Sequence, residues 1–196
     1  IDGLDGLAAG VSAISSVTLL TVAMLVGPEQ PYILIMTAIL AGATLGFLPY
    51  NFNPAKIFMG DTGALFLGYM LSVISVMGVL KSATALSILV PIFAMGLPIF
   101  DTLFAMIRRF ASGKSMVEAD KGHLHHRLLA KGYSQKKAVL TLYSVSAILG
   151  IGAIALVETK LKTAYILVFV VFLLASMGVK YLGLLDAGKG KNKLDA

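Results

Sequence analysis

The sequence predicts an all-α, polytopic integral membrane protein with about six transmembrane helices. Two features of composition and one of patterning support this class. The chain of 196 residues is 58% hydrophobic, with a mean hydropathy of +0.89. Only 13% of its residues are charged, against about 25% in an average soluble domain. The apolar residues also form continuous stretches of roughly the 17 to 25 residues that a helix needs to cross a bilayer.

Each stretch begins or ends at residues that interrupt a membrane helix. The first three are separated by segment 27–31, which contains two prolines, and by Asn51-Phe52-Asn53-Pro54, and the third ends at Lys81-Ser82. The fourth ends at the long polar segment 108–137, and Glu158-Thr159-Lys160 divides the last two. Proline breaks helices, and charged side chains avoid the hydrocarbon. The expected helices are Leu7–Val26, Tyr32–Pro49, Gly63–Leu80, Thr84–Ile107, Ala138–Val157 and Ala164–Leu182.

The positive charges predict which side of the membrane carries the polar loops. Six crossings place the first residues, the 51–61 loop, the 108–137 segment and the C-terminal tail on one side. Of the 16 Lys and Arg, that side holds 13: one in the 51–61 loop, eight in the 108–137 segment and four in the tail. Because cytoplasmic loops are enriched in Lys and Arg, this side is expected to be cytoplasmic. The other side holds Lys81, Lys160 and Lys162.

Composition also excludes several classes. There are no cysteines, which excludes disulfides and thiolate-metal sites. The net charge of +6 reflects the loops, and no basic stripe interleaved with aromatic residues appears, so no nucleic-acid partner is expected. Residues 1–183 are expected to form one transmembrane domain, and residues 184–196 a basic, disordered cytoplasmic tail near anionic headgroups. Because the chain opens inside a polar motif, we expect it to be the C-terminal part of a longer protein.

Carboxylates flanked by glycine occur at two points on this cytoplasmic side. Asp2 and Asp5 are three residues apart in Asp2-Gly3-Leu4-Asp5-Gly6, so a helix that began there would carry both on one face. Helix capping explains one of them, whereas a glycine after each would let a ligand approach the backbone. Asp61, in Gly60-Asp61-Thr62-Gly63, is either a helix cap or a ligand for a hard cation such as Mg²⁺.

Three histidines lie within four positions of the long polar segment, in His123-Leu124-His125-His126-Arg127. A zinc site would need a closing ligand at a defined spacing, and no HExxH pattern is present. With Lys121 and Lys131 nearby, the cluster is better suited to donate hydrogen bonds to phosphate oxygens. A solvated basic loop beside the membrane is the plainer interpretation of the same residues.

Asp101 is the one carboxylate inside an expected membrane helix. It follows Pro98 and lies about one and a half to two helical turns before Arg108, within the cytoplasmic third of the bilayer. Ionisable residues at this depth are candidates for function. Pairing with Arg108, Arg109 or another basic group of the following loop is the structural alternative, and the sequence favours neither.

Four segments then carry a family resemblance: IDGLDGLAAG, NFNPAKIFMGDTGALFLGY, PIFDTLFAMIRR and ADKGHLHHRLL. In order and spacing they resemble successive motifs of the polyprenyl-phosphate N-acetylhexosamine-1-phosphate transferases, the superfamily of MraY and WecA, from residue 1 to about residue 157. HLHHR preceded by ADK is similar to the WecA/TagO branch, which uses UDP-N-acetylglucosamine. It differs from the HHH segment of the muramoyl-pentapeptide branch.

The resemblance implies a multi-pass enzyme of the bacterial plasma membrane with its active-site loops in the cytoplasm. Such an enzyme transfers N-acetylglucosamine 1-phosphate, or a related sugar phosphate, from a UDP-sugar to undecaprenyl phosphate and releases UMP, as the first membrane step of a cell-envelope glycan. It implies Mg²⁺ as cofactor, with Mn²⁺ as a substitute, and it allows a homodimer. The family's upstream aspartate pair and several N-terminal helices precede this chain, so the fragment alone is not expected to be active.

The resemblance also implies a role for each candidate residue. It makes Asp61 the Mg²⁺ ligand, Phe58 the residue that stacks on uracil, and Asn51 a hydrogen-bond partner of the uridine. Asp2 and Asp5 are expected to line the nucleotide-sugar cleft, and Lys121 and Asp101 to contact substrate. The residues expected to orient the diphosphate or the sugar are His123, His125, His126 and Arg127.

Two other classes of protein share part of this pattern. A secondary transporter also places polar residues in apolar helices, but its binding groups cluster near the bilayer midplane. Here only Asp101 is inside an expected helix. A non-catalytic homologue or membrane scaffold would keep the helices and lose the site, whereas this chain keeps Asp2, Asp5, Asp61 and the three histidines. The sequence therefore favours the enzyme over both.

Overall fold

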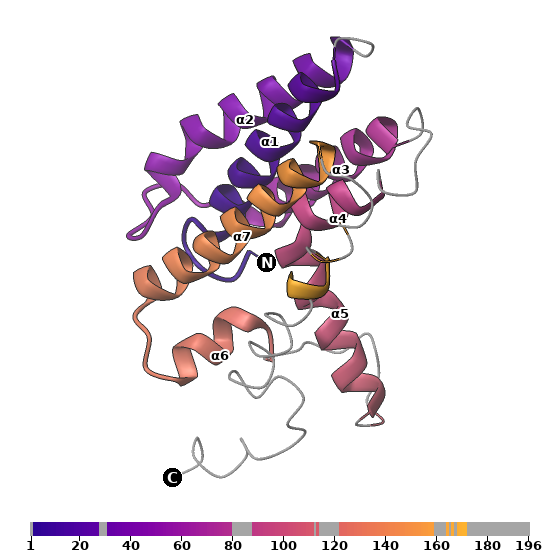
Figure 1. Ribbon diagram of the computed structural model, residues 1–196. Helices are drawn as coiled ribbons and strands as arrows, with labels where there is room; N and C mark the ends of the chain where they lie inside the picture. The colour runs from indigo at the N-terminus through magenta and orange to yellow at the C-terminus, as the bar shows by residue number, and fades with distance from the viewer. Residues whose placement is uncertain are drawn as a thin grey trace, which may run out of the picture.

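The computed structural model is helical throughout the residues that it describes (Figure 1). These residues are 2–27, 31–79, 88–111, 113, 122–158, 164, 166 and 168–171. The all-α class predicted from the sequence is confirmed for them. The helices are α1 (Leu7–Val26), α2 (Pro31–Asn51), α3 (Gly60–Val79), α4 (Leu89–Ala94), α5 (Gly96–Ala111), α6 (Leu124–Ala130) and α7 (Gln135–Glu158).

Four of these helices, α1, α2, α3 and α7, are long and apolar enough to cross a membrane, as judged by length and composition within the described residues. They correspond to the first, second, third and fifth expected crossings, with ends that differ by at most three residues. The prediction of a polytopic membrane protein is supported, and the count of six is not confirmed. Most of the sixth expected helix, Ala164–Leu182, and the whole tail 184–196 lie outside the described residues.

The fourth expected crossing, Thr84–Ile107, is not one continuous helix in its described part. Helix α4 ends at Ala94, Met95 follows as a turn, and α5 begins at Gly96. Pro98 has no N–H to donate to the Ala94 carbonyl four residues earlier, and a proline ring crowds that carbonyl. The Ser15 hydroxyl of α1 donates to it instead, at 2.7 Å. The prediction of a single helix was wrong because this proline divides it.

Helix α1 lies at the centre of the bundle, between α2 and α7 (Figure 1). Within the membrane-length window of each helix, 56% of α1 is buried, against 17% of α3. Small residues allow the close contacts, as membrane helices generally require. A Cβ on Gly10 or Gly150 would lie within 2.4 Å of a side chain on the neighbouring helix. The outer faces of α2 and α3 expose large apolar side chains that suit lipid, among them Ile35, Ile39, Leu65 and Phe66.

A separate apolar cluster joins α1, α5, α6 and α7 at the end of the bundle where α1 begins. Leu128 of α6 is 3% exposed and belongs to one apolar cluster with side chains of the three other helices. This cluster fixes the short α6 beneath the start of α7, and with it the histidine motif that α6 carries. Its buried members are Leu7, Val11, Leu97, Leu128, Ala138, Val139 and Leu142.

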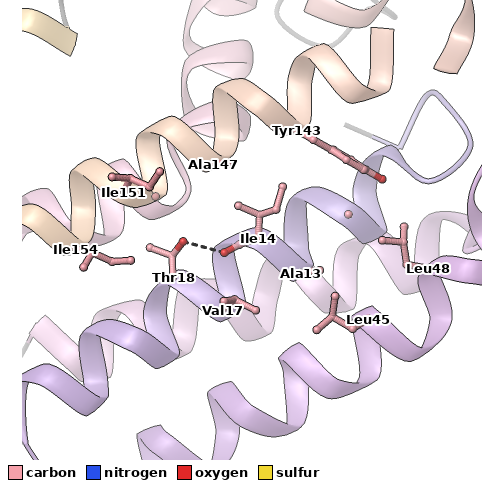
Figure 2. Close-up of a pocket in the computed structure, with 12 residues that line it drawn as sticks. Ala13, Ile14, Val17, Thr18, Leu45, Leu48, Tyr143, Ala147, Ile151 and Ile154 are labelled. Carbon is pink, nitrogen blue, oxygen red and sulfur yellow. Dashed lines mark hydrogen bonds between the residues drawn. The ribbon is translucent and has the colours of Figure 1, made fainter. Parts of the chain in front are cut away.

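An apolar cavity of about 330 Å³ opens between α1, α2 and α7 (Figure 2). Most of its lining is aliphatic, and the Thr18 hydroxyl within it donates to the Ile14 carbonyl of its own helix at 2.8 Å. Tyr143 closes the end nearest the start of α1. None of the ionisable residues that the sequence singled out lines this cavity, so the polar site lies elsewhere.

Candidate active site

Three motifs that are far apart in the sequence meet at one end of the bundle. The 2–6 segment contacts the 51–57 loop through Asp5 and contacts α6 through Gly3. The Asp2 carboxyl and the Asp61 carboxyl are also close enough to interact electrostatically. The sequence predicted that these motifs share one membrane face, and in the described residues they come together as one cluster.

Asp5 holds the loop that leads to Asp61. Its Oδ2 atom accepts a hydrogen bond from the Asn53 side-chain amide at 3.0 Å and another from the Ala55 backbone N–H at 3.1 Å. The two donors flank Pro54, which follows a cis peptide bond. Two bonds to one carboxylate oxygen fix the loop against the start of α1. The geometry therefore gives Asp5 a contact within the protein, in addition to the cleft-lining role implied by the resemblance.

The side-chain amide of Asn51, the last residue of α2, also makes its hydrogen bonds within the protein. Only 4% of it is exposed. Its Oδ1 atom accepts from the Gly6 N–H at 3.1 Å, and its Nδ2 atom donates to the Ile57 carbonyl at 2.9 Å. The amide thus connects the start of α1 to the same loop. Its hydrogen bond to a uridine stays a prediction.

The residues after this loop face outward. Phe58 is 76% exposed and lies in the loop that precedes α3. The loop beneath it is held because the Lys56 and Ile57 N–H groups both donate to the Tyr50 carbonyl, at 2.8 and 3.1 Å. Phe58 is therefore a supported, accessible aromatic surface. Asp61 follows in the first turn of α3 and is exposed.

Asp2 and Asp61 are both exposed, and their like charges lie close enough to interact. Loss of solvation raises the pKa of Asp2 above its ordinary value, and the Asp61 carboxylate raises it further. A divalent cation between the two would relieve this repulsion. Within residues 2–27, 31–79, 88–111 and 122–158, no three His, Cys, Asp or Glu side chains form a group that could hold a metal. Two carboxylates fit Mg²⁺, which commonly takes its other ligands from water and substrate phosphates.

His125 packs against the backbone of the first motif. A Cβ placed on Gly3 would lie 2.2 Å from its Nε2 atom, so the space beside Gly3 is filled by this imidazole. The ring centroid lies 4.2 Å from that of His126 and 6.0 Å from that of His123. Burial and then the His126 charge lower the pKa of His125 to about 4, although Asp101 opposes the change. His125 is therefore neutral at pH 7 and offers one N–H donor, not a positive charge.

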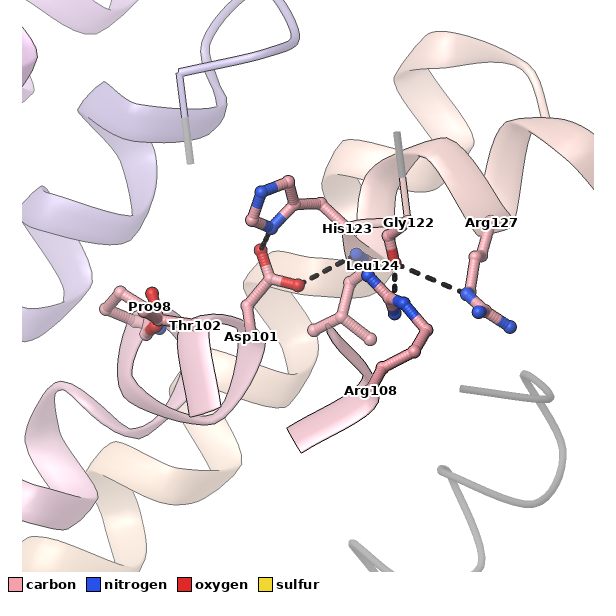
Figure 3. A network of polar contacts seen from close by, with 8 residues as sticks. All are labelled: Pro98, Asp101, Thr102, Arg108, Gly122, His123, Leu124 and Arg127. Carbon is pink, nitrogen blue, oxygen red and sulfur yellow. Dashed lines mark hydrogen bonds and ion pairs between the residues drawn. The ribbon is translucent and has the colours of Figure 1, made fainter. Parts of the chain in front are cut away.

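Asp101 links α5 to the histidine motif (Figure 3). It is 5% exposed, its Oδ2 atom lies 2.9 Å from His123 Nδ1, and its Oδ1 atom accepts from the Leu124 N–H at 2.9 Å. The second bond satisfies a backbone donor at the start of α6, which α6 does not cap itself. Asp101 thus pairs with a basic group of the following loop, His123, and its contact with substrate stays a prediction.

The arginines near this pair converge on one carbonyl. Arg108 Nη1 and Arg127 Nε donate to the Gly122 carbonyl at 3.0 and 3.3 Å (Figure 3). A Cβ on Gly122 would lie 2.1 Å from the Arg108 guanidinium, so glycine leaves the room for this approach. His126 is exposed at the same end of α6. Lys121, another predicted contact to substrate, lies outside the described residues.

Sequence reasoning missed one residue of this cluster, Tyr143 on α7. Its hydroxyl donates to the Gly6 carbonyl, 137 residues away in the chain. Gly6 has a φ of +80°, which favours glycine, and a Cβ there would lie 3.1 Å from Phe52 and 3.2 Å from the Tyr143 hydroxyl. The glycines of the first motif were predicted to admit a ligand to the backbone. In the structure, the side chains that approach them are His125, Phe52 and Tyr143. No local pattern around Tyr143 marks it.

Comparison with known proteins finds one matching family and several similar membrane transferases. Residues 1–79 match the model of glycosyl transferase family 4. The chain is 48% identical over 174 residues to a probable undecaprenyl-phosphate N-acetylglucosaminyl 1-phosphate transferase of Bacillus subtilis, covering 89% of this chain and 47% of that protein. It is 38% identical over 170 residues to a decaprenyl-phosphate N-acetylglucosaminephosphotransferase of Mycolicibacterium smegmatis, covering 78% of this chain and 42% of that protein.

A third relative comes from the other branch. The chain is 36% identical over 162 residues to a phospho-N-acetylmuramoyl-pentapeptide-transferase of Trichormus variabilis, covering 79% of this chain and 41% of that protein. The chain thus spans about half the length of the curated relatives it matches. Both the matched family model and the matched motifs agree with the resemblance described above. The chain belongs to glycosyl transferase family 4, within the MraY/WecA superfamily of membrane phosphotransferases.

Proposed function

We propose that the protein to which this chain belongs transfers N-acetylglucosamine 1-phosphate from UDP-N-acetylglucosamine to undecaprenyl phosphate. The observation that carries the proposal is the meeting of Asp2, Asp61, Phe58 and the histidine motif at one end of an apolar helical bundle. The names of the relatives support the transferred group and the acceptor, because the more similar ones are N-acetylglucosamine phosphate transferases acting on polyprenyl phosphates. One substrate is a lipid, which accounts for the membrane setting.

The reaction is a phosphoryl transfer. An oxygen of the lipid phosphate forms a bond to the β-phosphorus of the UDP-sugar, and the bond from that phosphorus to the bridging oxygen breaks, so UMP leaves. Catalysis of such a step needs alignment of the two phosphates and stabilisation of spreading negative charge. Fixed N–H donors provide this stabilisation without reorganising. His123, His126 and Arg127 supply such donors, and neutral His125 adds one N–H.

Two features of the cluster fit the nucleotide and the cation. The exposed ring of Phe58, on a loop held by Asp5 and Asn51, is suited to stack on a base. Asp61, with Asp2 beside it, is the proposed Mg²⁺ ligand. When bound, the cation would neutralise charge on the diphosphate. Mn²⁺, another oxygen-seeking cation, is expected to substitute.

The Asp61→Asn variant tests the proposal. Asp61 lies in the first turn of α3, where loss of its charge is expected to cost the helix at most about 1 kcal/mol, while the charge that a hard cation needs is removed. In the intact protein in detergent, UMP release from UDP-N-acetylglucosamine is measured across a Mg²⁺ titration, beside thermal stability. We expect a folded variant without transfer even at high Mg²⁺. Near-normal UMP release would make Asp61 a structural residue of the first turn of α3 and assign the metal elsewhere.

The same proposal places the site in the cytoplasm of a bacterium, at its plasma membrane. A cysteine introduced at the exposed Ala130 of α6 is expected to resist impermeant thiol reagents in intact cells, whereas one at Lys160 is expected to react. Labelling of Ala130→Cys from outside would reverse the orientation. A homodimer stays a prediction of the resemblance, and light scattering on the purified protein measures it.

A further inference from the structure

We propose that Tyr143 is a positioning residue for the 51–61 loop. Its phenol, seated in the space left by Gly10, holds the start of α1, and the start of α1 holds the loop through Asn51. Tyr143 also meets the loop directly, because its ring lies 6.5 Å from that of Phe52 between centroids. Phe52 is not among the residues proposed to contact substrate. The effect expected on the KM rests on the proposed function, whereas the effect expected on the stability of the loop does not.

The first link joins α7 to α1. Tyr143 points from α7 toward the start of α1 (Figure 2). A Cβ on Gly10 would lie 2.0 Å from the Cζ and hydroxyl of Tyr143, so only glycine admits the ring at this distance. The hydroxyl donates to the Gly6 carbonyl, which also accepts the Gly10 N–H at 2.9 Å. The carbonyl of Gly6 is therefore fixed from both its own helix and α7.

The second link joins α1 to the loop. The N–H of Gly6 donates to Asn51 Oδ1 at 3.1 Å, and Asn51 Nδ2 donates to the Ile57 carbonyl at 2.9 Å. The first bond is buried, because Gly6 and Asn51 both are, whereas the second is part-buried, because Ile57 is exposed. A continuous path of hydrogen bonds thus runs from Tyr143 through Gly6 and Asn51 to Ile57. Ile57 directly precedes the exposed Phe58.

The end of this path matters because Phe58 has little packing of its own. An aromatic surface that is 76% exposed keeps a fixed orientation only if its backbone is held. If the loop is loose, a ligand must order it on binding, and that cost lowers affinity. Loss of one hydrogen bond in the path is worth about a three- to tenfold change in an equilibrium. The effect should fall on nucleotide binding, not on the chemical step.

Tyr143→Phe, which keeps the ring and removes the donor, tests the inference in the intact protein in detergent. Tyr69→Phe on the exposed face of α3 is the matched control. The first measurement is the rate of tryptic cleavage after the exposed Lys56 without substrate. We expect a three- to tenfold faster cleavage in Tyr143→Phe and no change in the control. Gly10→Ala, which displaces the phenol, should give the same change, and combining it with Tyr143→Phe should add little further.

The second measurement is transfer kinetics. The KM for UDP-N-acetylglucosamine should rise about three- to tenfold in Tyr143→Phe, with kcat unchanged. A residue that only stabilises the fold would lower the active fraction, and so the apparent kcat, without changing KM. An unchanged cleavage rate after Lys56 would overturn the inference. So would faster cleavage combined with a normal KM, because the loop would then be looser without affecting the site.

UMP release by the wild-type protein tests the proposed function separately. If the wild-type protein releases no UMP under any condition, the proposed reaction is wrong. Faster cleavage after Lys56 in Tyr143→Phe would still support the path from Tyr143 to the loop.

Discussion

The contact between Gly3 and His125 gives the sharpest prediction. Gly3→Ala places a methyl group 2.2 Å from His125 Nε2, 2.6 Å from Cε1 and 3.0 Å from Cδ2. Such contacts are far shorter than the van der Waals separation, so the imidazole must move. His125 is 5% exposed and lies against His126, which leaves it little room. Overpacking of this kind costs about 1 to 3 kcal/mol. Gly3→Ala should therefore destabilise the protein by that amount.

A double-mutant cycle separates this clash from other effects of the methyl group. In the His125→Ala background the imidazole is absent, so Gly3→Ala should cost less than about 0.5 kcal/mol. Gly68→Ala is the matched control, because no atom lies within 4 Å of the Cβ position at Gly68. Alanine there should be neutral or stabilising by up to about 1 kcal/mol, as expected inside a helix.

Equilibrium unfolding of the intact protein in mixed micelles with increasing SDS measures all four variants. The reasoning requires an interaction free energy of at least about 1 kcal/mol between positions 3 and 125. Additive effects of Gly3→Ala and His125→Ala would refute the contact. A loss of stability in Gly68→Ala equal to that in Gly3→Ala would show that the backbone, and not the imidazole, is the cause.

Three further predictions follow from single contacts. Ser15→Ala removes the 2.7 Å donor to the Ala94 carbonyl and should lower the free energy of unfolding by about 1 to 3 kcal/mol. Pro98→Ala in the same protein should recover part of this loss, because it restores a backbone N–H for that carbonyl. Additive losses of stability in the SDS assay would contradict this. Asp101→Asn keeps an acceptor for the Leu124 N–H but puts an amide NH₂ opposite His123 Nδ1. Transfer activity should therefore fall more than stability does. Normal turnover would mean that the contact between Asp101 and His123 is only structural. His125 has a pKa of about 4, below its usual 6.5, so the unfolded chain takes up a proton first as pH falls. Stability should thus be lost from pH 6.5 down to 4, by up to about 3 kcal/mol, and His125→Gln should flatten this slope.

Hydropathy was enough to predict the four long helices, because a bilayer imposes a length on any apolar segment. It did not predict the break at Met95. Pro98 is visible in the sequence, but a proline divides a membrane helix only where the released carbonyl finds another partner. That partner is Ser15, 79 residues earlier in the chain, and its local pattern indicates nothing more than helix packing.

The sequence was enough to predict which residues belong to the candidate site, but not which contacts they make. The motifs marked Asp2, Asp5, Asp61 and the histidines as one group, and the structure places them together. Which of them hold the protein and which face outward depends on distant partners. Asp5 binds Asn53 and Ala55, about 50 residues away, whereas Phe58 is exposed because its loop is supported from behind. A neutral His125 could not be predicted either, because its burial comes from packing against Gly3.

The bond between Tyr143 and Gly6 has a consequence for the order in which the protein is made. Synthesis runs from residue 6 to residue 143, so the loop that carries Phe58 and the start of α3 leave the ribosome long before α7 does. Until α7 has entered the membrane, the Gly6 carbonyl lacks the Tyr143 hydroxyl. Nascent chains that stop short of α7 therefore cannot complete the path of hydrogen bonds from Tyr143 to the loop that carries Phe58, and that path closes only when the last of its helices has entered the membrane.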